Sequence, residues 1–157
     1  MNTYILNFSP TGMLPTKQMN HHTPISTSEI IEDVLMAAEL GASIAHLHAR
    51  DKKTGEPTCD LITFATIIEG IRKHNKQLIL CVSLSGRNVS DPALRALPLS
   101  LDGEAKPDMG SLTLSSMNFS TQPSINAPST INYLAQEMVL KGISPEVEIF
   151  DSGMSNY

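Results

Sequence analysis

A six-residue stretch decides the fold of this chain: it reads SIAHLH at residues 43–48. Apart from its two histidines the stretch is apolar, and it lies between Gly41 and a polar run of turn formers at residues 51–57. A short apolar run between turn signals is typical of a strand buried in a sheet. We therefore expect a buried strand that ends near His48.

The segments on either side of this strand have the periodicity of amphipathic helices. The capping-box spacing of Ser26 and Glu29 predicts a helix over residues 26–41, with Gly41 at its end. Further helical segments are expected at residues 60–75, 92–97 and 128–142.

Four other apolar runs predict strands, at residues 4–7, 77–82, 109–114 and 147–150. Strand and helix alternate without a hairpin signal, which favours an α/β fold with parallel strands joined by right-handed crossovers. The strands of such a sheet pack on both faces. We therefore expect these apolar side chains to be buried: Ile5, Leu6, Ile44, Leu47, Ile79, Leu80, Leu112 and Ile149.

The composition favours a single-domain protein that acts on small molecules. The chain has 157 residues, a formal net charge of -5 and no run of Lys or Arg, so it lacks the basic surface of a nucleic-acid binder or an anionic-membrane binder. No apolar stretch is long enough for a membrane span. Its two cysteines, Cys59 and Cys81, read as free thiols of a reducing compartment, which predicts a cytoplasmic location.

His46 and His48 are the clearest candidates for chemistry. Residues two apart on a strand project from the same face, so both imidazoles can reach one metal ion. The end of a parallel strand is also where barrel enzymes place their active sites. The competing interpretation is a pair of histidines hydrogen-bonded to nearby backbone. A zinc site needs a third protein ligand, and the sequence offers no convincing one, since His21, His22 and His74 are poorly placed.

Several longer motifs carry a resemblance to a known family. They read PTGM at residues 10–13, HLHAR at 46–50, PDMGSL at 107–112, MNF at 117–119 and PEVEIFDSGM at 145–154. With these motifs the chain resembles the beta-keto acid cleavage enzymes over essentially its whole length. The resemblance implies a TIM (β/α)8 barrel, and residues 1–157 would form a partial barrel domain, truncated after about five strands.

The resemblance also implies an activity and a set of site residues. Family members use zinc to hold a beta-keto acid and exchange its acyl part with acetyl-CoA, which yields an acyl-CoA and acetoacetate. Here His46 and His48 would bind the zinc, and Ser83 and Thr113 would contact the substrate. Independently of the resemblance, the charge of Arg50 could bind a substrate carboxylate or the phosphates of CoA, although an arginine just after a strand is usually a solvated residue at the rim. Where the family has a Ser-Thr-Gly-Gly turn, this chain reads SLSGR at residues 83–87, which changes the floor of the pocket.

The family's third zinc ligand, a glutamate, and its acid–base residues come from later strands, so no catalytic residue is assigned within this chain. Proton abstraction next to a carbonyl needs a positioned base, and we expect weak or no catalysis from the 157 residues alone. The expected partners are a beta-keto acid, acetyl-CoA, and either further copies of the chain in a homo-oligomer or a complementing C-terminal segment.

Two other functional classes remain open. One is a catalytically inactive half-barrel that is stabilised by self-association, because an open sheet exposes its edges. The other is a metal-dependent hydrolase of the amidohydrolase type, in which a His-x-His pair ends the first strand of the barrel. Here a strand and a helix precede the pair.

Overall fold

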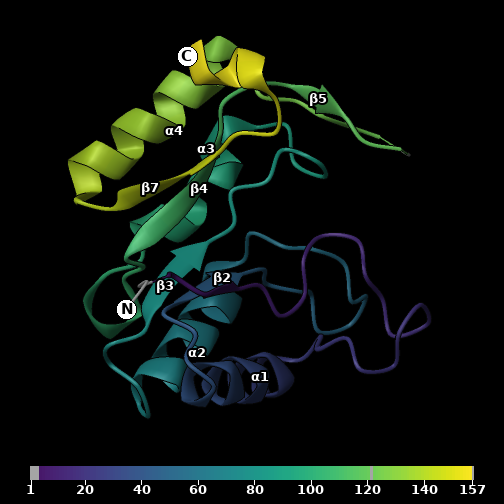
Figure 1. Cartoon of the computed structure of the whole chain (residues 1–157), viewed down its shortest axis with the longest axis vertical. Helices are drawn as coiled ribbons and strands as arrows, with labels where there is room; N and C mark the ends of the chain where they lie inside the picture. The colour runs from purple at the N-terminus through teal and green to yellow at the C-terminus, as the bar shows by residue number, and fades with distance from the viewer. Residues whose placement is uncertain (1–3, 121, 157) are drawn as a thin grey trace.

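The computed structural model describes residues 4–120 and 122–156, and a curled parallel sheet lies at its centre (Figure 1). The sheet has five strands in the order β1-β2-β3-β4-β7, and each neighbouring pair is parallel. The strands are β1 (Asn7–Phe8), β2 (Ile44–Leu47), β3 (Ile79–Val82), β4 (Met109–Thr113) and β7 (Ser144–Glu148). This curled half-barrel confirms the predicted β/α architecture, and the chain carries five strands of a TIM barrel.

Three long helices connect the strands and begin where the sequence predicts. They are α1 (Thr27–Glu39), α2 (Leu61–Arg72) and α4 (Pro128–Lys141). Ser26 caps α1 in a complete capping box, and α4 ends at Gly142, whose φ of 61° is a left-handed conformation that glycine adopts at little cost. The shorter elements are α3 (Pro92–Arg95) and the 3₁₀ helices η1 (Leu97–Ser100), η2 (Gly103–Ala105) and η3 (Ser152–Asn156).

The core lies between these helices and the outer face of the sheet. Because strand side chains alternate between two faces, every second strand residue points outward against the helices. The outward residues Leu47, Leu80 and Val82 are fully buried, and Leu112 is 6% exposed. On the helix side the core is formed by Ile30, Val34, Phe64, Ile67, Ile68, Ile71, Leu134 and Met138.

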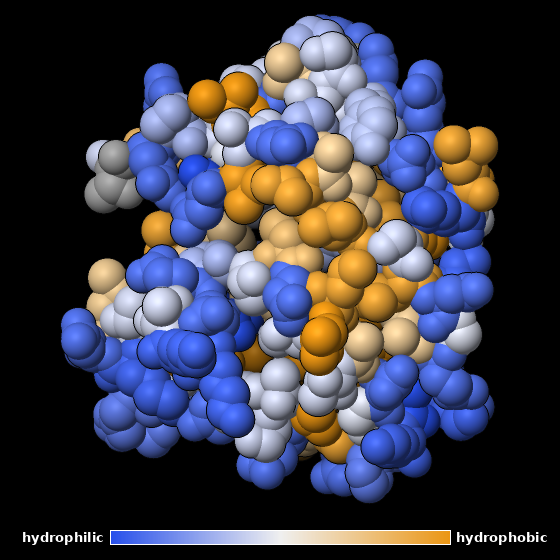
Figure 2. All heavy atoms as spheres, turned by 180° about the vertical axis from the view of Figure 1, so that it is seen from behind, coloured by the Kyte–Doolittle hydropathy of each residue, from blue (hydrophilic) through white to orange (hydrophobic). Residues whose placement is uncertain are grey.

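The expectation that all strand apolar residues are buried is confirmed on the outer face and wrong elsewhere. Ile79 is 39% exposed, and it shares the inner face with its partner Ile44, which is half-buried. Ile5, Leu6 and Ile149 lie outside the regular strands and are 74%, 45% and 52% exposed. The helices pack on the outer face, so Ile79 on the inner face has no helix over it in the described part of the chain, and the other three residues lie beyond the strand ends. Viewed from behind, apolar side chains also reach the surface in the middle of the molecule, with polar ones around them (Figure 2).

Some element boundaries also differ from the sequence expectation. The first strand begins at Asn7, not Tyr4, and the last strand covers Ser144–Glu148, not residues 147–150. The observed last strand includes Pro145, and a proline is tolerated in a strand at a sheet edge. A small antiparallel hairpin, β5 (Met117–Asn118) with β6 (Pro123–Ser124), was not expected because its strands are too short to show a pattern.

Among the described residues, no helix has the length and apolar character needed to cross a membrane.

Candidate active site on the inner face of the sheet

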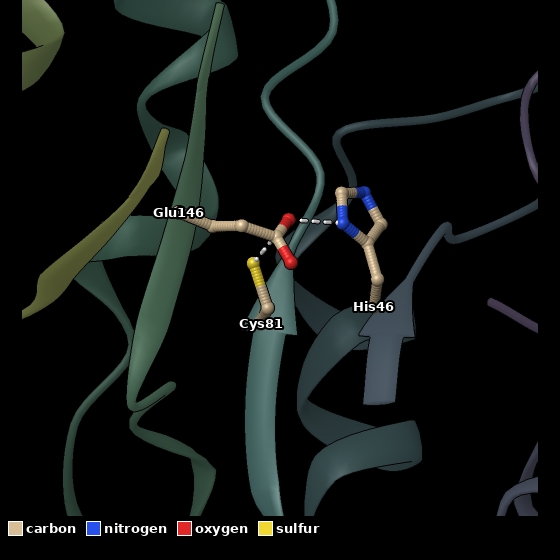
Figure 3. Close-up of side chains that lie close together, drawn as sticks. All are labelled: His46, Cys81 and Glu146. Atoms are coloured by element: carbon tan, nitrogen blue, oxygen red, sulfur yellow. Dashed lines mark hydrogen bonds and ion pairs between the residues drawn. The ribbon is translucent and has the colours of Figure 1, made fainter. Parts of the chain in front are cut away.

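Side chains from three strands converge on the inner face of the sheet. His46 of β2 and Cys81 of β3 are register partners, and Glu146 of β7 points toward both of them (Figure 3). Their potential ligand atoms all lie within 4.8 Å of one another. His46 and Glu146, together with His48 and Glu148, border an open hollow of about 550 Å³. Cys81 is buried beside them. The inner face therefore gathers imidazole, thiol and carboxylate groups.

The Glu146 carboxylate is the centre of this cluster. Its Oε2 accepts a hydrogen bond from Nδ1 of His46, and its Oε1 accepts one from Nδ2 of Asn7 on β1. The Cys81 thiol, 3.3 Å away, also donates to Oε2. Burial alone would raise the pKa of Glu146. The hydrogen bond and charge of His46 lower it, as do the hydrogen bonds from Cys81 and Asn7, so that the pKa of Glu146 is below its ordinary value. Glu146 is therefore a carboxylate at neutral pH.

Cys81 is a thiol in this environment. It is fully buried, and burial, followed by the charge of Glu146, raises its pKa well above the ordinary value. Cys59 is half-buried and its pKa is also raised by burial. Both cysteines are free, as the sequence predicts. Cys81 lacks the electropositive surroundings of a reactive thiolate, and at Cys59 burial outweighs the nearby charge of Arg95.

The imidazole ring of His48 is stacked against the ring of His46. The ring centroids are 4.8 Å apart and the planes are 29° from parallel. Burial is the largest cause that lowers the pKa of His48 to about 3, and repulsion by Arg50, by Arg87 and by His46 in its protonated form adds to it. Its Nδ1 is buried and has no hydrogen-bond partner among the described residues. His48 is therefore a neutral imidazole with an unpaired buried nitrogen.

The histidine pair is thus brought together as the alternation of strand side chains predicts. A neutral imidazole is the form that binds a metal ion, and an unpaired buried nitrogen has a cost that a metal would remove. The donor set of two imidazoles beside a carboxylate fits zinc. That the pair binds zinc stays a prediction.

Ser83 and Thr113 border a second, smaller pocket of about 220 Å³ that His48 also lines. Ser83 follows β3 and is 8% exposed, while the Thr113 hydroxyl donates to Oε2 of Glu148. The two predicted substrate residues therefore share one pocket with one of the predicted metal ligands. Substrate contact by either residue stays a prediction.

Arg50 lies away from this pocket, in the loops behind it. Its guanidinium donates to the carbonyl oxygens of Gly12 at 2.6 Å, Gly55 at 2.9 Å and Pro15 at 3.1 Å. The side chain is 3% exposed. These bonds tie the loop after β1 to the loop after β2. The arrangement favours a role in holding the rim of the site over the predicted direct contact with substrate.

The far wall of the pocket contains residues that the sequence did not mark as functional. The guanidinium of Arg87 lies over the ring of Phe119 at 3.4 Å from its centroid, and both residues line the pocket. Gly86 is required beside them, because a Cβ there would lie 2.6 Å from the carbonyl oxygen of Ile125. Arg87 therefore places a positive charge in the wall of this pocket.

Glu146 and Cys81 were also missed as members of the site. The sequence predicts a strand that begins at Val147, which leaves Glu146 in a loop, and it predicts Cys81 only as a free thiol. The signal was present in the alternation of Glu146 and Glu148, which places both carboxylates on one face of an extended segment. That they face the histidines required the curvature of the sheet.

The fold and this cluster define a β/α-barrel protein with histidines and carboxylates at the inner strand ends. The family model for the beta-keto acid cleavage enzymes matches residues 3–157. The chain therefore belongs to the beta-keto acid cleavage enzyme family, as its motifs predict.

Relatives with curated names cover nearly the whole chain. It is 41% identical over 151 residues to the 3-oxoadipate:acetyl-CoA acetyltransferase of Cupriavidus necator. The matched region is 96% of this chain and 51% of the relative. It is 32% identical to the 3-keto-5-aminohexanoate cleavage enzyme of Fusobacterium nucleatum, over 100% of this chain and 56% of the relative. The chain spans about half the length of the curated relatives it matches.

Solved structures of ObcA share the fold. The binary complex of ObcA with oxaloacetate matches with a TM-score of 0.78 and 22% identity, over 86% of this chain and 32% of ObcA. The apo structure of ObcA gives a TM-score of 0.76 at 23% identity, with the same coverage. At these identities the likeness concerns the fold alone.

Proposed function

We propose that this chain supplies the first five strands of an enzyme that exchanges the acyl part of a beta-keto acid with acetyl-CoA, giving an acyl-CoA and acetoacetate. The observation that carries the proposal is the 41% identity to a 3-oxoadipate:acetyl-CoA acetyltransferase over 96% of the chain. The clustering of His46, His48 and Glu146 on the inner face supports it, because barrel enzymes assemble their active sites at strand ends.

In this proposal His46 and His48 hold a zinc ion. A zinc ion there would polarise the keto oxygen of the substrate. The residues of the chain bind and orient: Ser83 offers a hydroxyl beside His48, and Thr113 is held in place by Glu148. Arg87 adds a positive charge to the same pocket, which favours a substrate that carries a second negative group.

The proposal treats residues 1–157 as one partial barrel domain that other strands complete. The strands β1 and β7 are the two edges of the described sheet, and their unpaired backbone groups suit a complementing segment. The proposed location is the cytoplasm, a compartment that suits two free cysteines.

A complementation assay tests the proposal. The chain would be mixed with a separate polypeptide that carries the remaining strands of the Cupriavidus necator relative, and acetoacetate formation from 3-oxoadipate and acetyl-CoA would be measured. We expect turnover from the mixture and none from the chain alone, since a barrel enzyme takes its catalytic groups from several strands.

Matched variants sharpen this assay. His46→Ala in the mixture should abolish turnover, whereas His74→Ala, an exposed histidine beyond α2, should keep it. A mixture that forms a stable complex but shows no turnover would contradict the proposed activity. Robust turnover by the chain alone would show that the required base lies within these residues.

A catalytically inactive, self-associating half-barrel is the second candidate. It is favoured by the outer surface of α4, where Val139 and Leu140 are 79% and 78% exposed beside a shallow apolar groove. Light scattering of the purified chain separates the two candidates. Stable dimers that do not bind the complementing segment would favour the inactive half-barrel over the enzyme.

A further inference from the structure

We propose that Glu146 is a positioning residue that keeps the proton of the His46 ring on Nδ1, so that Nε2 is the nitrogen offered to a metal ion. The inference rests on the proposed function in one respect, since the ion is the one that His46 and His48 would share. The protonation pattern itself can be measured without any metal.

The hydrogen bond between His46 and Glu146 carries the proposal. A neutral imidazole has one nitrogen that donates and one that accepts. Glu146 is an acceptor on the Nδ1 side of His46, so the proton belongs on Nδ1 and the lone pair on Nε2. The side chains of His46 and Glu146 are only 11% and 17% exposed, which limits competition from water.

The carboxylate is itself fixed, as an orienting group must be. Glu146 comes from β7 at one edge of the sheet, yet one of its oxygens is bonded to Asn7 of β1 at the opposite edge. The Cys81 thiol of β3 donates to the other oxygen, which also faces His46. Bonds from three different strands therefore hold this carboxylate across the hollow, and Figure 3 shows the two from β2 and β3. Metal-binding histidines commonly have such a carboxylate on their second nitrogen.

The same three residues suggest a competing arrangement, in which His46, Cys81 and Glu146 are themselves the metal ligands. The contacts disfavour it. Oε2 of Glu146 is in direct contact with both the ring nitrogen and the thiol, so an ion between these atoms would have to displace two hydrogen bonds. His48, with an unpaired buried Nδ1, would then remain without a partner.

Nitrogen-15 NMR of histidine-labelled protein tests the protonation pattern directly. We expect His46 in the Nδ1–H form in the wild type and a shift toward the Nε2–H form in Glu146→Ala. Glu146→Gln keeps an acceptor and should retain the wild-type pattern. Glu148→Gln removes the same charge from the same hollow without touching His46, and should leave the pattern unchanged. An Nε2–H form of His46 in the wild type would overturn the proposal.

A metal titration tests the consequence for binding. Removing an orienting carboxylate typically weakens metal affinity by about 10- to 100-fold. We expect a loss of that size for Zn²⁺ with Glu146→Ala, a smaller loss with Glu146→Gln, and the smallest with Glu148→Gln. Wild-type affinity in a folded Glu146→Ala variant would overturn the positioning role.

Cobalt replaces zinc as a spectroscopic probe for the competing arrangement. We expect Co²⁺ to bind without a sulfur-to-metal charge-transfer band, and Cys81→Ser to leave its spectrum unchanged. A band that disappears in Cys81→Ser but persists in Cys59→Ser would show that Cys81 is a ligand and would overturn the proposal. A double variant, His46→Ala with His48→Ala, separates this inference from the proposed function. If this variant and the wild type bind zinc equally, the proposed metal site is wrong, whereas the proton position on His46 is still decided by the NMR measurement.

Discussion

The two faces of the central sheet carry different kinds of side chain and are buried to different extents. On the outer face Leu47, Leu80 and Val82 are fully buried against helices. On the inner face, neighbouring residues of the same strands carry His46, Cys81 and a partly exposed Ile79. Each strand therefore contributes to stability with one side and offers chemical groups with the other. The alternation of side chains separates the two roles residue by residue.

The largest effect expected from this comparison is on stability, and two adjacent residues of β3 test it. Leu80→Ala on the outer face should destabilise the chain by about 2–5 kcal/mol, because it leaves a cavity in a fully packed core. Ile79→Ala on the inner face should cost about 1 kcal/mol or less, since Ile79 is already 39% exposed. Urea denaturation of both variants measures the difference, and equal losses would contradict the comparison.

A smaller loss is expected at the rim between the two faces. Gly86→Ala would bring a Cβ to 2.8 Å from Nη1 of Arg95, whose buried guanidinium bonds Leu84 and Asn126 at 2.7 Å each. Overpacking of this kind costs about 1–3 kcal/mol. Thermal unfolding checks the loss. Gly41→Ala provides a contrast, since a Cβ there meets nothing within 4 Å and only the backbone conformation is strained.

The smallest of these effects concerns the outer helix layer. Ser26→Ala removes the side-chain cap of α1 and should cost about 1 kcal/mol. Ser26→Asp keeps an acceptor at the cap and should retain most of the stability. Equal stability of the alanine and wild-type chains, measured by urea denaturation, would show that the capping box contributes nothing.

The outer face could be predicted from the sequence because local signals specify it. Ser26, Asp60 and Pro128 mark helix starts by their own chemistry, and the apolar residues that follow repeat at helical spacing. The inner face could not be predicted in this way, because local sequence signals do not specify what covers it. The burial of Ile79 depends on what covers that face, which the periodicity of β3 does not report.

The site was predictable in part for the same reason. His46 and His48 are two residues apart, so strand geometry alone predicts that they share a face. Glu146 is 100 residues further along the chain, and its contact with His46 depends on the curl of the whole sheet. The charge of Arg50 predicts a contact with substrate, but the three bonds of its guanidinium to loop carbonyls depend on the folding of two long loops.

The central claim is that the inner face binds a metal ion through the histidine pair. The most direct measurement is a calorimetric titration of Zn²⁺ into the wild-type chain and into His46→Ala, with the fold of both checked by circular dichroism. A lost ligand should weaken binding by about tenfold or more, at least as much as a lost orienting group. We predict that loss in a His46→Ala variant that remains folded in the absence of metal. Equal zinc affinity in the two proteins would contradict the account.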